Sequence, residues 1–141
     1  HALIQCEKFY NKKFDYVIEL MATNPLKSVK DINNVIKILI KKKADSVIAV
    51  NQLFDHHPAR IKKILKDKLH DFSVKEKLES RRQDLKPNAY VRSGSIYAMS
   101  RRFVMQEKRY QSGKSFAYIL PSERTINIDD KNDLLIAKIK V

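Results

Sequence analysis

Two apolar runs joined by a helical pattern constrain the fold of this chain most. Residues 14–20 (FDYVIEL) are aromatic and β-branched, and residues 45–50 (DSVIAV) form a second near-continuous apolar run. Between them, Ser28 can cap a helix whose apolar side chains recur every three or four residues as far as the lysines at 41–43. This order predicts a βαβ unit, and continuous apolar strands favour a parallel sheet buried on both faces.

Further elements are expected on either side of this unit. Residues 89–100, which include Gly94, and residues 115–120 predict two more strands, with a short helix over 100–106 between them. Asp130 is expected to cap a last helix. Residues 2–10 resemble the end of an amphipathic helix already in progress, so we expect the sequence to be part of a longer protein.

Residues 55–87 differ in composition from the rest and do not predict another strand and helix. They are polar, with short apolar pieces, and we expect them to leave the sheet as an excursion. The adjacent His56 and His57 would point to opposite faces of an extended segment, which favours a structural or interface role over a metal site. Arg81 and Arg82 suit a carboxylate or phosphate ligand, or a solvated surface.

The composition is that of one folded domain. The chain has 141 residues, 43% of them of apolar type, with only two glycines and four prolines, which argues against intrinsic disorder. No apolar run approaches the length of about 20 residues that crosses a bilayer. The single cysteine, Cys6, excludes an intrachain disulfide and favours a reducing, cytoplasmic compartment.

The charge is strongly positive, with 29 basic and 16 acidic residues giving a net charge of +13. Such a surplus suggests a polyanionic partner, and a basic module that binds nucleic acid is one alternative for the function. However, 21 of the basic residues are lysines, and they are scattered, whereas nucleic-acid surfaces favour arginine. A compositional bias towards Lys, Ile and Asn explains the surplus equally well, and we expect no nucleic-acid partner.

Polar side chains with chemical potential follow two of the expected strands. Thr23 and Asn24 come directly after the first strand, where ligands bind in open α/β sheets, although an ordinary turn would also use Asn-Pro. Asn127 and Asp129 would share one side of an extended segment and offer oxygen atoms to Mg²⁺. The alternative is that these residues, like Asp130, only form turns and caps.

Taken in order, these segments resemble the CMP-sialic acid synthetases, or acylneuraminate cytidylyltransferases. The family motif Gln-Pro-Thr-Ser-Pro-Leu-Arg corresponds to Met-Ala-Thr-Asn-Pro-Leu-Lys at residues 21–27. Five other matching segments occur in the family's order: ADSV (44–47), HHP (56–58), RRQDL (81–85), GSIY (94–97) and ID (128–129). The resemblance implies an α/β fold with a doubly wound, mostly parallel, Rossmann-like sheet of the nucleotide-diphospho-sugar transferase type.

The resemblance also implies a domain plan and a reaction. Residues 1–141 correspond to the C-terminal part of one cytidylyltransferase domain, and residues 52–92 to a dimerisation element within it. The reaction is transfer of CMP from CTP to a nonulosonic sugar acid, with release of pyrophosphate and with Mg²⁺ as cofactor. A homodimer is implied, because in this family the excursion reaches into the partner's active site.

Individual residues take expected roles only through this resemblance, and none is assigned a catalytic role. Asn127 and Asp129 fall at the metal-binding pair, and Arg60 and Arg82 belong to the excursion that contacts the partner's site. The sugar-side positions are Met21, Thr23, Asn24, Ser93 and Tyr97.

Three departures from the family pattern concern the substrate. Met21 replaces Gln, Ser93 replaces Asn, and Asn127 replaces the first Asp of the metal pair. They fit a different nonulosonic acid, such as a legionaminic-type sugar, and activation of another sugar acid by the same fold remains an alternative. The family's basic, glycine-rich CTP-binding loop would lie before His1, so we expect the chain alone not to turn over CTP.

Overall fold

The computed structural model describes residues 1–75, 81–107 and 109–140. They form two compact units, one made of residues 1–50 and 92–141 and the other of residues 51–91. The second unit covers the residues for which the excursion is predicted, and its part at 76–80, which includes Leu78, lies outside the described residues. Each unit is described by itself below.

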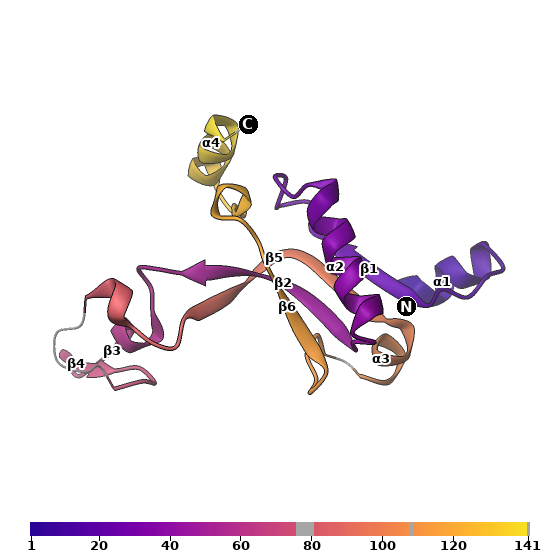
Figure 1. Ribbon diagram of the computed structural model, residues 1–141. Helices are drawn as coiled ribbons and strands as arrows, with labels where there is room; N and C mark the ends of the chain where they lie inside the picture. Colours follow the sequence, from indigo (N-terminus) through magenta and orange to yellow (C-terminus); the bar gives the residue numbers. More distant parts are fainter. Residues whose placement is uncertain (76–80, 108, 141) are drawn as a thin grey trace. The chain divides into compact units, whose positions relative to one another are not determined.

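Within its described residues, the larger unit contains a sheet, four α-helices and one turn of 3₁₀ helix. Figure 1 shows the helices and strands of this unit. Its elements are α1 (Ala2–Phe9), β1 (Tyr16–Leu20), α2 (Val29–Lys41), β2 (Ser46–Leu53), β5 (Ala89–Ser100), α3 (Arg101–Gln106), β6 (Ser115–Ile119), η3 (Ser122–Arg124) and α4 (Lys131–Ile139), with β2 and β5 extending into the other unit. All the helices and strands expected from the sequence are present, with ends that differ by a few residues.

The sheet has the order β1-β5-β2-β6 and is mixed. β2 and β6 pair in parallel, whereas β1 and β5 pair antiparallel, with Tyr16 opposite Ser100 and Leu20 opposite Ile96. The α/β class is therefore confirmed, with more antiparallel pairing than the strand pattern predicts. The reason is that the chain enters β5 from residues 51–91 and not from a crossover helix, so β5 is inserted between the two strands of the expected βαβ unit.

The first strand is less buried than its apolar sequence predicts. None of its five residues is fully buried, and Tyr16 and Leu20 at its ends are exposed. In the described sheet β1 is an edge strand with a single neighbour, β5. An apolar run indicates a strand but does not determine how many neighbours cover it, so this part of the prediction was wrong.

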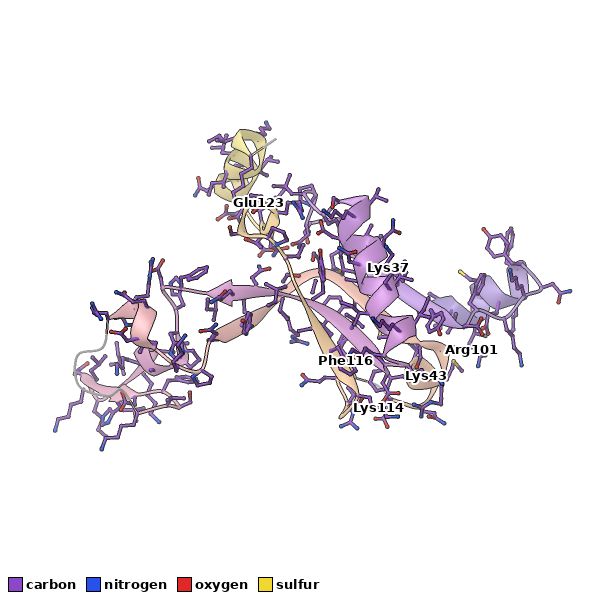
Figure 2. The ribbon with its side chains drawn as sticks, viewed as in Figure 1. Lys37, Lys43, Arg101, Lys114, Phe116 and Glu123 are labelled. Atoms are coloured by element: carbon purple, nitrogen blue, oxygen red, sulfur yellow. The ribbon has the colours of Figure 1, made fainter. Side chains whose placement is uncertain are left out.

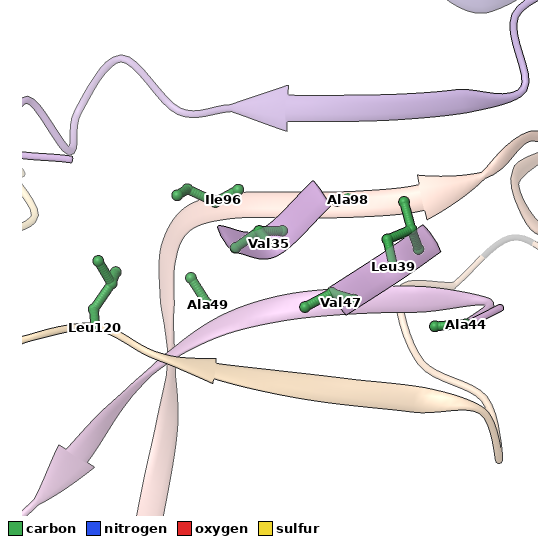
Figure 3. Close-up of a cluster of buried hydrophobic side chains, with 8 residues drawn as sticks. All are labelled: Val35, Leu39, Ala44, Val47, Ala49, Ile96, Ala98 and Leu120. Atoms are coloured by element: carbon green, nitrogen blue, oxygen red, sulfur yellow. The ribbon is translucent and has the colours of Figure 1, made fainter. Parts of the chain in front are cut away.

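The hydrophobic core lies between α2 and one face of the sheet. In Figure 3, Val35 and Leu39 of α2 lie over Ile96 of β5 and Val47 of β2, and all four are completely buried. α2 begins at a capping box, in which Ser28 accepts from the N–H of Asp31 and the Asp31 carboxylate accepts from the N–H of Ser28. The predicted helical face is therefore the face that builds the core.

The unit at residues 51–91 is organised around a hairpin. β3 (Lys62–Leu65) and β4 (Lys68–Asp71) pair antiparallel through a turn in which Lys66 and Asp67 both have positive φ, as a two-residue hairpin loop requires. The 3₁₀ turns η1 (Pro58–Arg60) and η2 (Arg82–Asp84) complete the described elements. Large apolar side chains of this unit are exposed: Phe54, Ile61, Ile64, Leu65, Leu69, Phe72, Val74, Tyr90 and Val91.

The surface carries the positive charge at separate positions. Lys37 lies on α2, Lys43 follows the end of that helix, and Lys114 precedes β6 (Figure 2), and all three are exposed. Among the described helices, none is both long and apolar enough to span a bilayer.

Candidate functional site

Three segments far apart in the sequence meet beyond the end of β1. The N–H of Met21 donates to the carbonyl of Ser95 (3.2 Å), and the N–H of Ile128 donates to the carbonyl of Thr23 (2.8 Å). The side chains of Asn24 and Asn127 are also 2.8 Å apart, across 103 residues of sequence. The structure thus brings together the turn after β1, the middle of β5 and the segment that follows η3.

The turn at residues 21–27 is closed by a lysine from within. The Lys27 ammonium donates to the carbonyl oxygens of Met21 and Asn24, at 2.6 Å in both cases. Burial lowers the pKa of Lys27 from its ordinary value. Lys27 stands where the family motif has Arg. Its ammonium group stabilises the shape of the turn and adds positive charge beside it.

Gly94 allows β5 to pass this turn. Its φ of 71° lies in the left-handed region, where a residue with a Cβ atom is strained. Space is not the constraint, because an added Cβ would lie 3.7 Å from Nδ2 of Asn24, which is an ordinary contact. The glycine is therefore required by the backbone conformation beside Asn24.

Ser93 is close to the cluster, but its hydroxyl is used within the sheet. The hydroxyl donates to the carbonyl of Ala49 (3.0 Å) and lies 2.7 Å from the hydroxyl of Ser95. Ser93 is buried, and what it turns towards the amide of Asn24 is its backbone carbonyl, at 3.2 Å. The structure therefore does not present the Ser93 side chain as a free sugar ligand.

Tyr97 makes its contacts elsewhere. It lies opposite Glu19 in the β1–β5 register, and its ring packs against that of Tyr110 with centroids 4.7 Å apart. The Tyr110 hydroxyl donates to Glu19 (3.3 Å), and the pKa of Tyr110 is raised chiefly by the charge of that carboxylate. These contacts place the ring of Tyr97 in an aromatic pair, and no described contact joins it to Asn24 or Asn127.

Asn127 and Asp129 form the polar end of the cluster. Both are exposed, and Nδ2 of Asn127 donates to the Asp129 carboxylate at 2.5 Å. Asp130 caps α4 through the N–H groups of Asn132 and Asp133, as predicted. Within the described ranges no three His, Cys, Asp or Glu side chains are grouped as a metal site. A cation bound here would therefore need further ligands, such as water or phosphate oxygens, besides these side chains.

A buried ion pair that sequence reasoning missed fixes the segment before Asn127. Asp31 is fully buried and accepts from Nε and Nη2 of Arg124 (2.8 and 2.9 Å) and from the Tyr118 hydroxyl (2.8 Å). Burial alone would raise the pKa of Asp31, but the hydrogen bonds from Arg124, Ser28 and Tyr118 outweigh it and hold this pKa well below its usual value. The capping-box spacing gave a signal for Asp31, but none for Arg124.

The two arginines expected at the partner's site belong to the unit at 51–91. Arg82 pairs with Asp55 (2.5 Å) and lies 6.0 Å from the ring centre of Phe54. This unit has a cavity of about 400 Å³ lined by Arg82, Gln52, His57 and other residues of the same unit. His57 caps η1 by accepting from the N–H of Ala59, which agrees with the structural role expected for it, whereas His56 is exposed. Arg60 follows in η1 and is exposed.

Comparison with known proteins finds distant relatives with two different names. The chain is 23% identical over 145 residues to "Post-translational flagellin modification protein B" of Campylobacter coli, an alignment that covers 99% of this chain and 58% of that protein. It is 22% and 24% identical to N-acylneuraminate cytidylyltransferases of Streptococcus agalactiae serotypes V and III, over 89% of this chain and 30% of each of those proteins. No protein-family model matches.

These relatives confirm the resemblance that the motifs predict. The curated homologues are N-acylneuraminate cytidylyltransferases and a flagellin modification protein, consistent with part of a CMP-sialic acid synthetase-like protein. The chain spans 30% to 58% of the length of these relatives.

Proposed function

We propose that this chain is part of a cytidylyltransferase that transfers CMP from CTP to a sialic-acid-like nonulosonic acid. The observation that carries the proposal is the contact of the Thr23–Asn24 turn with the Asn127–Asp129 segment, through Ile128 N–H to Thr23 O and the Asn24–Asn127 pair. These are the segments in which the family resemblance places sugar and metal ligands, and the names of the relatives support the same reaction.

In the proposed reaction, a hydroxyl oxygen of the sugar acid forms a bond to the α-phosphorus of CTP. The bond between that phosphorus and the pyrophosphate oxygen breaks, and the hydroxyl proton leaves to solvent or base. Such a reaction is accelerated by positioning and by neutralising phosphate charge. On the sugar side, Met21 and Thr23 are exposed at the turn, and the Lys27 ammonium adds a positive charge that favours an acidic sugar.

Asn127 and Asp129 are the proposed protein ligands of Mg²⁺. The pair offers one carboxylate, and a half-turn of the Asn127 amide, which now donates to Asp129, would add its oxygen. This donor set fits a cation that takes one or two protein carboxylates and fills its remaining positions with water and substrate phosphates. When bound, Mg²⁺ would reduce the charge repulsion between the triphosphate and the incoming oxygen. The neutral Asn127 makes this pair a weaker cation site than two carboxylates.

The unit at residues 51–91 is the proposed dimerisation element of a homodimer, with Arg60 and Arg82 acting at the partner's active site. Its exposed apolar side chains, among them Ile64, Leu69 and Phe72, support an interface, because a hairpin gains little from exposing them to water. The exposed Arg82, beside the cavity of about 400 Å³, suits a carboxylate or phosphate group. A cytoplasmic location completes the proposal.

We propose Tyr97 and Ser93 as sugar-side residues only because of the positions that they occupy in the family's motif order. Both lie on β5, but the Ser93 hydroxyl and the Tyr97 ring already have partners within the larger unit. At Met21, a thioether stands where the family has an amide, and it cannot form the same strong hydrogen bonds. We therefore propose a nonulosonic acid whose groups at this position are less polar than those of N-acetylneuraminic acid.

The test is formation of CMP-sugar from CTP, Mg²⁺ and a panel of nonulosonic acids. Both the 141-residue chain and the longest product of its gene are assayed, with Asp129→Ala and, as a matched surface control, Asp15→Ala. We expect turnover of at least one sugar acid by the longest product and none by the 141-residue chain. In the longest product, turnover should be lost in Asp129→Ala and retained in Asp15→Ala. If no preparation forms CMP-sugar, and oligonucleotides bind with a steep salt dependence, the nucleic-acid alternative replaces the proposal.

A further inference from the structure

The side chain of Asn24 is buried among groups that fix the direction of its amide. It is 3% exposed, and its amide faces the Ser93 carbonyl (3.2 Å), the Ile126 carbonyl (2.9 Å) and the amide of Asn127 (2.8 Å). If Nδ2 donates to Asn127, the Asn24 oxygen faces two carbonyl oxygens that can only accept. An acceptor buried against two acceptors is destabilising, because none of the three supplies a hydrogen-bond donor to the others.

A half-turn of the Asn24 amide removes this conflict. Nδ2 then donates to both the Ser93 and the Ile126 carbonyls, and Oδ1 faces Asn127. To serve that oxygen, Asn127 has to present its own Nδ2, the donor end of its amide. The orientation of a buried side chain therefore sets the orientation of an exposed one.

The consequence appears at Asp129. When Asn127 turns its nitrogen to Asn24, its oxygen faces the Asp129 carboxylate across a separation of 2.5 Å between the two side-chain atoms. An amide oxygen in contact with an ionised carboxylate oxygen is repelled by it unless a cation or a proton lies between them. Without a cation, Asn127 can instead donate to Asp129, but then Asn24 keeps its unfavourable contact with the carbonyls.

We propose that Asn24 is a positioning residue that turns the Asn127 oxygen towards Asp129 and so prepares the pair for a divalent cation. The inference rests on the proposed function, in which that cation is Mg²⁺. Asn24 itself does not touch the metal. Its contribution is directional: the buried donor contacts with Ser93 and Ile126 are fully satisfied only when the Asn127 oxygen is available to the cation.

The same logic explains why an amide at position 127 works beside Asn24. An amide has a donor end for the Asn24 oxygen and an acceptor end for the cation, whereas a carboxylate would offer the Asn24 oxygen no donor. An Asp at position 127 has two equivalent oxygens and needs no orientation. The dependence of cation affinity on Asn24 should therefore vanish when Asn127 is replaced by Asp.

The experiment is a double-mutant comparison of cation binding by the full chain. Mn²⁺ serves as the probe, and its affinity is measured from paramagnetic broadening of the backbone amide signals of Ile128 and Asp129. We compare Asn24→Ala in the natural background and in the Asn127→Asp background, with Asp129→Ala to identify the site. Circular dichroism checks each variant for folding, and Asn24→Ser gives the same comparison if Asn24→Ala does not fold.

We expect Asn24→Ala to weaken Mn²⁺ binding about ten-fold, the size of effect typical of residues that orient a metal ligand. In the Asn127→Asp background we expect no loss. Equal losses in both backgrounds would overturn the inference, since Asn24 would then act only by holding the segments together. Broadening that is absent, or that survives Asp129→Ala, would overturn the metal pair as well, while the CMP-sugar assay judges the proposed reaction independently.

Discussion

The two units of the chain bury their side chains to very different extents. In the unit of residues 1–50 and 92–141, eight apolar side chains form one continuous buried cluster between α2 and the sheet. In the unit of residues 51–91, the buried residues among those described are His57 and Ala59, and the cross-strand pair of Ile64 and Leu69 in the hairpin is about 70% exposed.

Because of this difference, the two units must be stabilised in different ways. The larger unit obtains its stability from its own core and from satisfied buried polar groups such as Asp31. The hairpin unit has regular backbone pairing without a matching core, and two strands alone are only marginally stable in water. Its apolar side chains therefore fit a surface that becomes buried on assembly, as the proposed homodimer requires.

The largest expected effect is on assembly. Replacing the opposed pair by charges, in Ile64→Asp with Leu69→Asp, should convert a dimer completely to a monomer, because buried unpaired carboxylates would face the partner. Analytical ultracentrifugation of the chain measures this change. Val29→Asp is the matched control in the larger unit: Val29 is 74% exposed at the start of α2, and this variant should remain dimeric.

Two results would contradict a dimer interface at residues 51–91. The natural chain could sediment as a monomer across the accessible concentration range, which would contradict the dimer directly. Alternatively, Val29→Asp could dissociate the dimer as fully as the hairpin variant, which would move the interface to the larger unit.

The second expected effect is on the unfolding free energy of the isolated subunit. Leu39→Ala removes a completely buried side chain from the core and should cost about 2–5 kcal/mol. Ile64→Ala in the hairpin should cost less than about 0.5 kcal/mol, because that side chain is 72% exposed. Urea denaturation of dilute protein measures both values, and similar losses would mean that the hairpin has a core of its own.

The sequence predicted the elements of the fold well, for physical reasons that differ between strands and helices. The helix over residues 29–41 follows from apolar spacing and from the Ser28 cap, both of which are local signals. Strand partners are not local. The insertion of β5 between β1 and β2, and the exposure of β1 at the described edge of the sheet, depend on pairing across tens of residues, which an apolar run does not encode.

The candidate site was predictable in its segments but not in its contacts. Thr23, Asn24 and Asn127 were recognisable from motif order, and the structure brings them together. Arg124 carried no signal, because its meaning depends on Asp31, which lies 93 residues away and is buried only in the folded chain. Whether the cluster binds a sugar and Mg²⁺ stays a prediction.

A third, smaller effect concerns the cap of α2. Ser28→Ala removes the acceptor of the Asp31 N–H and a donor to the Asp31 carboxylate, and should cost about 1 kcal/mol in unfolding free energy. The equivalent change at α4, Asp130→Ala, should affect global unfolding less, because Ala137 is the one buried residue of that helix. Thermal or urea denaturation compares the two, and a larger loss for Asp130→Ala would show that α4 belongs to the core.

The smallest expected effect is the acid sensitivity of the ion pair between Glu7 and Arg101 in the larger unit. Glu7 accepts from Nε and Nη2 of Arg101 (2.7 and 2.9 Å), and these hydrogen bonds lower the pKa of Glu7 from 4.5 to about 2. A carboxyl group whose pKa is lower in the folded than in the unfolded state stabilises the fold at pH values above its pKa in the unfolded state. That stabilisation is therefore present above pH 4.5 and is lost as the pH falls towards 2.

Glu7→Gln should flatten the dependence of the melting temperature on pH over this interval, because the variant has no carboxyl to protonate. The hairpin unit offers the matched change in Asp55→Asn. Asp55 also has a lowered pKa, through its hydrogen bond with Arg82, but its side chain is 69% exposed, whereas that of Glu7 is 11% exposed. We expect the smaller change for Asp55→Asn, because water screens an exposed ion pair more strongly. A larger change for Asp55→Asn than for Glu7→Gln would mean that the ion pair in residues 51–91 stabilises the fold at least as much as the pair in the larger unit.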